Sequence, residues 1–158
     1  MKTIPEFLRR KAAGAPITMA TCYDAATAKI LNDTSVDALL VGDSCAMVVH
    51  GYDSTIHATV EMMAGHTAAV RRGSADKVII ADLPFLSYRG SEDASIQAVL
   101  SLMRAGANMY VENEQGITPI ELVTDKYDKT HDPRYLQARN AMIAEGVLFE
   151  AQLKKEKG

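Results

Sequence analysis

Short apolar runs alternate with amphipathic stretches along the first two thirds of the chain. The runs lack the polar alternation of a half-exposed strand, which is typical of strands buried on both faces of a parallel sheet. The stretches between them repeat their apolar residues at helical spacing. We therefore expect parallel strands covered by helices. The predicted strands cover residues 17–22, 38–41 and 78–81, and the predicted helices cover about 4–13, 25–31, 59–72 and 91–105.

The pattern changes after Gly106, where the alternation of strands and helices stops. A polar stretch leads into an apolar segment over residues 116–123, and a charged linker follows over residues 125–129. A final helix is expected over residues 134–149. No strand of the earlier apolar type is predicted beyond Val111.

The expected fold is α/β, with two parts. Residues 1–109 are predicted to form a partial (βα)-barrel of three to four parallel strands with helices, because a complete barrel needs about 250 residues. Residues 110–158 are predicted to form a helical C-terminal segment. An open sheet of few strands leaves unpaired edges that invite association, so we expect a homo-oligomer.

Composition and net charge argue against several classes of protein. The chain has 158 residues, 47% of them apolar, which is enough for a hydrophobic core. Its net charge of -3 offers no basic surface for nucleic acid or an anionic membrane. We expect no secretion signal and no membrane span. Two cysteines, Cys22 and Cys45, without CxxC spacing suit a cytoplasmic protein.

A carboxylate follows each of the three predicted strands: Asp24, Asp43 and Asp82. The carboxyl ends of parallel strands share one edge, where ligands bind. Asp24 directly precedes a helix, so we favour a capping role for it. Asp43 and Asp82 lie well ahead of their predicted helices, so capping fits them poorly. Two such carboxylates can hold Mg²⁺, which prefers oxygen ligands and keeps several waters.

Other polar side chains near the predicted strand ends are less informative. Ser44 can bond a ligand carboxylate or a loop amide. His66 lies within a predicted helix, where we expect it to pack against neighbouring side chains. His50 and His57 lie in the loop without the spacing of a metal motif, and no phosphate loop or nucleophile elbow occurs.

Six short motifs follow one another along the chain: Thr21–Asp24, Val41–Ser44, Met47–Val49, Gly51–Thr55, His66–Gly73 and Ala81–Tyr88. Their sequences and order resemble the ketopantoate hydroxymethyltransferase family over about residues 2–109. The resemblance implies a (βα)-barrel enzyme that transfers a hydroxymethyl group from methylenetetrahydrofolate to 3-methyl-2-oxobutanoate, with Mg²⁺, in pantothenate biosynthesis. It also implies that Asp43 and Asp82 bind Mg²⁺ and that Asp43, Ser44 and Asp82 form the oxoacid site.

The same resemblance marks departures from the family. After Gly106, the family carries a substrate-binding Lys and a metal-binding Glu two residues later. An ungapped alignment places Val111 and Asn113 there, and Glu112 falls one residue early, on the opposite face of a strand. The family's general base, a Glu further along, has no counterpart in this sequence. We therefore assign no catalytic residue and expect weak or absent turnover.

A second set of spaced positions runs into the C-terminal segment: Leu102–Asn108, Asn113, Gly116, Thr118, Pro119 and Leu122. This pattern resembles an ankyrin repeat. One repeat cannot bury its own face, so residues 117–149 are expected to form a helical hairpin packed on the α/β part or on a protein partner. Three interpretations stay open: a truncated relative of the enzyme, a non-catalytic binding or structural module, and a recombined or artificial fusion.

Overall fold

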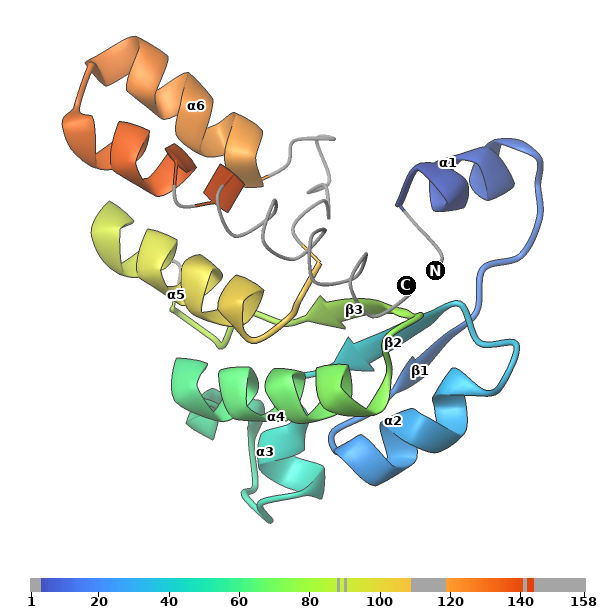
Figure 1. Ribbon diagram of the computed structural model, residues 1–158. Coiled ribbons are helices and arrows are strands. Elements are labelled where there is room, and N and C mark those ends of the chain that lie inside the picture. The colour runs from blue at the N-terminus through green and yellow to red at the C-terminus, as the bar shows by residue number, and fades with distance from the viewer. Residues whose placement is uncertain (1–3, 88, 90, 109–118, 141, 144–158) are drawn as a thin grey trace.

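The computed structural model describes residues 4–87, 89, 91–108, 119–140 and 142–143. Its sheet has the strand order β1 (Met19–Thr21), β2 (Ala38–Val41) and β3 (Val78–Ala81), with parallel pairing throughout. The carboxyl ends of the three strands therefore meet at one edge of the sheet (Figure 1). The α/β prediction with parallel strands is confirmed for this part of the chain.

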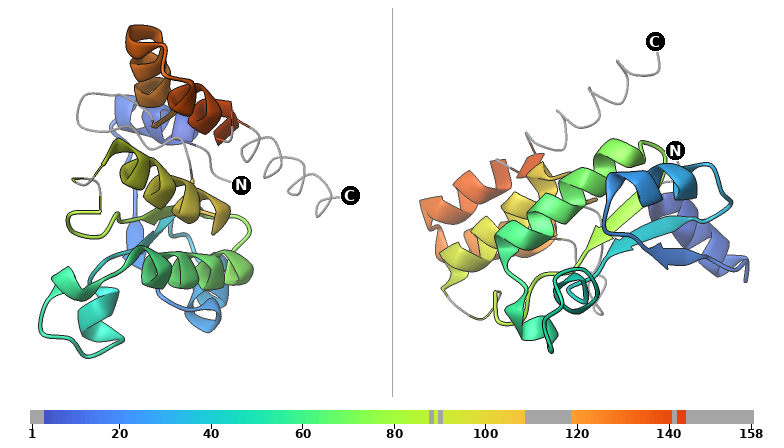
Figure 2. Two further views of the ribbon diagram at one scale, coloured as in Figure 1. Left: turned by 90° about the vertical axis from the view of Figure 1, so that its left-hand side faces the viewer. Right: turned by 90° about the horizontal axis from the view of Figure 1, so that it is seen from below.

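Helices α2, α4 and α5 lie side by side against the sheet (Figures 1 and 2). Helix α4 packs between the other two and contacts β2 and β3. This arrangement is that of successive βα units. The helices are α1 (Ile4–Ala12), α2 (Ala25–Asn32), α3 (Cys45–Val48), α4 (Val60–Gly73), α5 (Glu92–Arg104) and α6 (Pro119–Thr130), with a 3₁₀ turn η1 (Thr55–His57).

The core forms where the central strand meets α4. Leu39 and Val41 of β2 and Ile79 of β3 are fully buried, and Met63 and Val70 of α4 pack into the same cluster. Burial of each such side chain stabilises the fold by about 1.5–3 kcal/mol. The uninterrupted apolar runs of β2 and β3 reflect this burial, and both strands have the predicted bounds.

The structure corrects three expectations. Strand β1 covers only Met19–Thr21 of the predicted residues 17–22. The predicted loop over residues 45–56 contains α3 and most of η1, which are too short to show a periodic pattern. The predicted charged linker is helical and belongs to α6, where Lys129 pairs with Asp125 on the exposed face at 2.8 Å. Charged side chains at a spacing of four stabilise an exposed helix rather than interrupt it.

Residues 119–140 and 142–143, the described portion of the C-terminal part, form two helical segments that pack on α5. Helix α6 is followed by helical residues at 133–140 and 142–143. Tyr135, Ala138 and Met142 form a buried cluster with Leu100 of α5. The predicted helical pair on the α/β part is thus present over the described residues. Its resemblance to an ankyrin repeat stays a prediction, and residues 110–116 and 144–149 lie outside the described residues.

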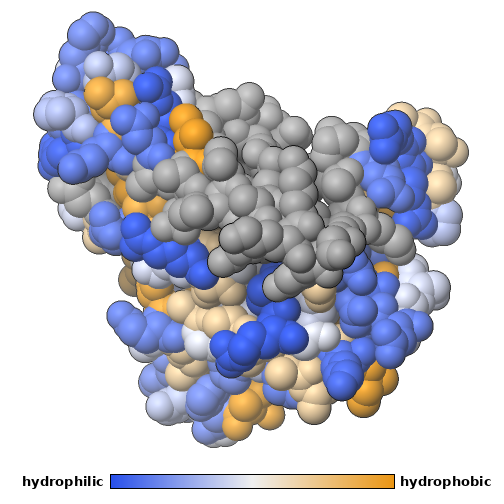
Figure 3. All heavy atoms as spheres, viewed as in Figure 1, coloured by the Kyte–Doolittle hydropathy of each residue, from blue (hydrophilic) through white to orange (hydrophobic). Residues whose placement is uncertain are grey.

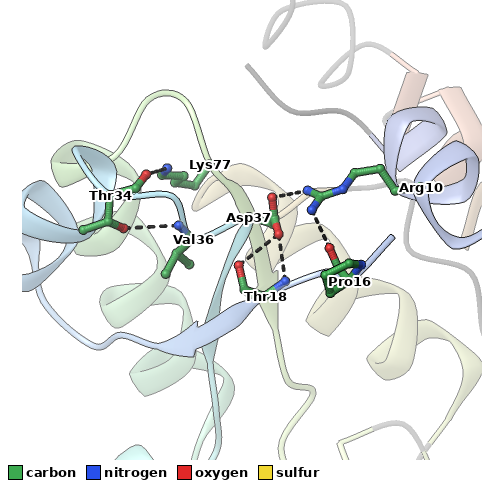
Figure 4. Close-up of polar contacts among 7 residues, drawn as sticks. All are labelled: Arg10, Pro16, Thr18, Thr34, Val36, Asp37 and Lys77. Atoms are coloured by element: carbon green, nitrogen blue, oxygen red, sulfur yellow. Dashed lines mark hydrogen bonds and ion pairs between the residues drawn. The ribbon is translucent and has the colours of Figure 1, made fainter. Parts of the chain in front are cut away.

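A polar network closes the amino-terminal ends of the strands (Figure 4). Arg10 of α1 pairs with the buried carboxylate of Asp37, just before β2. The same carboxylate accepts the backbone N–H of Thr18 at 2.7 Å and its hydroxyl at 2.9 Å. Lys77, just before β3, donates to the carbonyl of Thr34 at 2.7 Å. This network fixes α1 to the end of the sheet opposite the carboxyl-terminal edge.

The surface mixes polar and apolar residues, with small hydrophobic patches where α2 and α3 lie (Figure 3). Ile30, Met47 and Val48 are exposed there. Across the described ranges, no helix has the length and apolar character that crossing a bilayer requires. Both β1 and β3 are edge strands of the described sheet, and the homo-oligomer stays a prediction.

Candidate functional site

Asp43 and Asp82 leave neighbouring strands at the same edge of the sheet. The backbone N–H of Asp82 donates to the carbonyl of Val41 at 3.0 Å, so strand pairing continues up to this point. The Asp82 carboxylate then accepts the backbone N–H of Asp43 at 3.1 Å through Oδ2. The structure therefore brings together the two acidic residues that the sequence singled out. We call Asp43, Ser44 and Asp82 the rim site.

Gly42 keeps the space between the rim residues open. A Cβ atom at this position would lie 2.8 Å from Ser44 Oγ and 3.6 Å from Asp82 Oδ2. Real Cβ atoms essentially never approach another heavy atom to less than 3.0 Å, so a larger residue would displace the Ser44 hydroxyl. The absence of a side chain at Gly42 thus leaves space between the Ser44 hydroxyl and the Asp82 carboxylate.

The environment of Asp82 disfavours its charged form. Partial burial raises its pKa, the backbone N–H of Asp43 lowers it, and the negative charge of Asp43 raises it, with a net upward shift. Burial and a like charge both destabilise a carboxylate. A cation bound between the two carboxylates would relieve both effects.

The carboxylates of Asp43 and Asp82 fit Mg²⁺, a hard cation that takes oxygen ligands. This ion is commonly held by one or two protein carboxylates with several waters. In the described part of the chain, no group of three or more His, Cys, Asp or Glu side chains converges as a metal site. Asp43 and Asp82 would therefore hold the ion as a pair. Glu112 lies outside the described residues.

Asp82→Asn is expected to stabilise the metal-free protein at neutral pH. The amide keeps an oxygen for the Asp43 N–H and removes the disfavoured charge. Because the folded-state pKa of Asp82 is raised, the penalty is present above that pKa and disappears below the unfolded value. The stabilisation should therefore shrink as pH falls. Thermal melts in EDTA at several pH values check this, and an unchanged or lower melting temperature at neutral pH would contradict it.

The Ser44 hydroxyl borders the same space at Gly42 as Asp82 Oδ2, and it is oriented by Tyr23. The Tyr23 hydroxyl and Ser44 Oγ are 2.9 Å apart. Although Ser44 precedes α3, its side chain makes no capping bond to that helix. Tyr23 was not predicted as a site residue. Its position directly after the predicted strand 17–22, at the edge where ligands bind, could have indicated it.

The structure tests how Asp24 and Asp43 lie relative to the helices that follow them. Asp24 caps α2, since its carboxylate accepts the backbone N–H of Thr27 at 2.8 Å and its hydroxyl at 2.7 Å. The capping prediction is confirmed. Asp43 was expected well ahead of a helix, whereas α3 begins two residues later at Cys45. Over the described residues, the Asp43 carboxylate makes no capping hydrogen bond.

Sequence comparisons agree with this arrangement. The profile of the ketopantoate hydroxymethyltransferase family matches residues 1–127. The chain is 49% identical over 108 residues to 3-methyl-2-oxobutanoate hydroxymethyltransferase of Bdellovibrio bacteriovorus, covering 68% of this chain and 41% of that protein. It is 49% identical over 109 residues to the protein of the same name in Geobacillus thermodenitrificans, covering 68% and 39%. The chain thus spans about two fifths of the length of these relatives.

Proposed function

Because the chain belongs to the ketopantoate hydroxymethyltransferase family, we propose that its rim site binds Mg²⁺ and a small 2-oxoacid of the 3-methyl-2-oxobutanoate type. The observation that carries the proposal is the hydrogen bond from the Asp43 N–H to the Asp82 carboxylate across β2 and β3. It holds the Asp82 carboxylate beside the backbone of Asp43, at the edge where ligands of parallel α/β folds bind.

Each rim residue has a separate task in this proposal. Asp43 and Asp82 hold the cation with their carboxylate oxygens, and the Asp43 N–H keeps Asp82 in place. Ser44, oriented by the Tyr23 hydroxyl, donates a hydrogen bond to the carboxylate of the oxoacid. The bound Mg²⁺ would supply Lewis-acid polarisation of the oxoacid carbonyl.

We propose that hydroxymethyl transfer from methylenetetrahydrofolate is weak or absent in this chain by itself. The family resemblance places a substrate-binding Lys where this sequence has Val111. No described residue at the rim is a general base apart from the two carboxylates that hold the cation. General-base catalysis contributes roughly 10²–10⁴-fold to such a reaction, so its loss lowers turnover accordingly.

Calorimetric titration tests the binding proposal. The chain should give heat with Mg²⁺, and with 3-methyl-2-oxobutanoate once Mg²⁺ is present. Asp43→Ala should weaken both signals at least tenfold, because it removes one of the two carboxylates that hold the ion. Asp33→Ala removes an exposed carboxylate after α2 and is the matched control. No heat with the natural sequence, or equal heat with Asp43→Ala, would overturn the proposal.

A further inference from the structure

A pair of histidines lies outside the rim site. His50, which follows α3, and His66 of α4 face each other with their Nε2 atoms 2.9 Å apart. Their ring centroids are 5.1 Å apart and the ring planes are nearly perpendicular, at 76°. The Nδ1 atom of His66 lies 2.7 Å from the backbone carbonyl oxygen of Tyr23. The proposed function uses neither histidine.

These contacts define the proton positions of the neutral pair. A carbonyl oxygen only accepts hydrogen bonds, so Nδ1 of His66 carries the hydrogen and donates it to Tyr23. The Nε2 atom of His66 then has a lone pair, and Nε2–H of His50 donates to it. The hydrogen-bond network assigns both tautomers.

The hydrogen bond from His66 to the Tyr23 carbonyl is of the kind that supports metal-binding histidines. Such a histidine usually donates its second ring N–H to a carbonyl or carboxylate, which fixes the ring and directs the other nitrogen at the metal. In His66 the Tyr23 carbonyl fills that role. We propose that His50 and His66 form a site for a borderline divalent transition-metal cation such as Zn²⁺ or Ni²⁺, with water completing its coordination.

Metal binding requires a movement of the two rings. A tetrahedral ion with bonds of about 2.0–2.1 Å holds two nitrogens about 3.3 Å apart. The two Nε2 atoms therefore need to separate by a few tenths of an ångström. The rings also need to rotate, so that both lone pairs meet at the ion instead of lying along the line between the two Nε2 atoms. His50 is exposed and has room for this movement. The proton of His50 moves from Nε2 to Nδ1, so binding to the neutral pair releases no proton. No third His, Cys, Asp or Glu joins the pair among the residues described.

The local charge also suits a cation. Asp24 has a lowered pKa, chiefly because Thr27 donates hydrogen bonds to its carboxylate and, to a smaller extent, because it interacts with His66. A carboxylate that stays ionised near His66 attracts a positive ion. Imidazole nitrogens select transition metals whereas carboxylates select Mg²⁺, so this site and the rim site prefer different ions.

Titration of tag-free protein with Zn²⁺ in excess Mg²⁺, followed by calorimetry at pH 7.5, tests the inference. We expect His50→Gln and His66→Gln each to weaken Zn²⁺ binding at least tenfold. The matched control is His57→Gln, because the His57 ring stacks on Tyr52 and pairs with Asp53 rather than with the other two histidines. It should bind Zn²⁺ as the natural sequence does. Unchanged affinity in both His50→Gln and His66→Gln, or loss of Zn²⁺ binding only in Asp43→Asn, would overturn the inference.

Nuclear magnetic resonance of the natural sequence gives a second measurement that requires no variant to fold. Long-range ¹H–¹⁵N spectra should show an Nε2–H tautomer for His50 and an Nδ1–H tautomer for His66 without metal. Saturating Zn²⁺ should convert His50 to the Nδ1–H form and shift both Nε2 resonances. Histidine spectra that do not change on saturation would contradict the proposed site, whatever the outcome for Mg²⁺ at the rim.

Discussion

Gly73→Ala is expected to destabilise the fold by about 1–3 kcal/mol, the usual cost of overpacking a tight contact. A Cβ atom at Gly73 would lie 2.2 Å from the carbonyl oxygen of Ala25 and 2.8 Å from the Cβ of Ala28. The end of α4 therefore approaches the backbone of α2 too closely for any side chain. Urea denaturation followed by circular dichroism measures the change, since the chain has no Trp.

Gly65→Ala is the matched control in the same helix. No atom lies within 4 Å of a Cβ atom built at Gly65, so the substitution meets open space. Because Ala has the higher helix propensity, Gly65→Ala should stabilise the protein by up to about 1 kcal/mol. Equal effects at the two glycines would show that the close contact of α2 and α4 does not exist.

Asp37→Ala is expected to destabilise the protein by about 2–4 kcal/mol, because it leaves the donors of Thr18 unsatisfied and removes the partner of Arg10, whose side chain is only partly buried. Asp37 is 1% exposed and joins Arg10 of α1 to Thr18 before β1. Its loss leaves the Thr18 N–H and hydroxyl without this acceptor. The same urea measurement checks the prediction.

Two further variants separate the contributions of Asp37. Asp37→Asn keeps an acceptor for Thr18 but removes the charge, so it should cost less than Asp37→Ala. Asp76→Ala removes an exposed carboxylate near the same edge and should change the unfolding free energy by less than about 0.5 kcal/mol. A small effect of Asp37→Ala would mean that α1 is not held to the sheet by this network.

The sequence predicted the buried strands better than the exposed elements. β2 and β3 have the predicted bounds because both lie in the core and their apolar runs have no polar interruption. β1 is an edge strand in which Met19 is 54% exposed, and only part of its run pairs with β2. α6 was missed in part because its solvent-facing charges resemble those of a linker.

The position of the rim carboxylates could also be predicted, since parallel strands end at one edge. The contacts that define their chemistry could not. The Asp43 N–H reaches Asp82 across 39 residues of chain, and His50 reaches His66 across 16. Such contacts depend on how separate elements pack, and no local pattern of residues encodes them. The motifs of the rim identified the family, whereas the histidine pair emerged only from the folded chain.

The most direct test of the rim site is paramagnetic line broadening by Mn²⁺, which takes the same oxygen ligands as Mg²⁺. Amide resonances of Gly42, Asp43, Ser44 and Asp82 should broaden first and most strongly in a ¹H–¹⁵N spectrum. Amides of Asp37 and Lys77, at the opposite ends of β2 and β3, should keep their intensity longest. Broadening centred on those opposite ends or elsewhere, or no selective broadening, would contradict a cation site shared by Asp43 and Asp82.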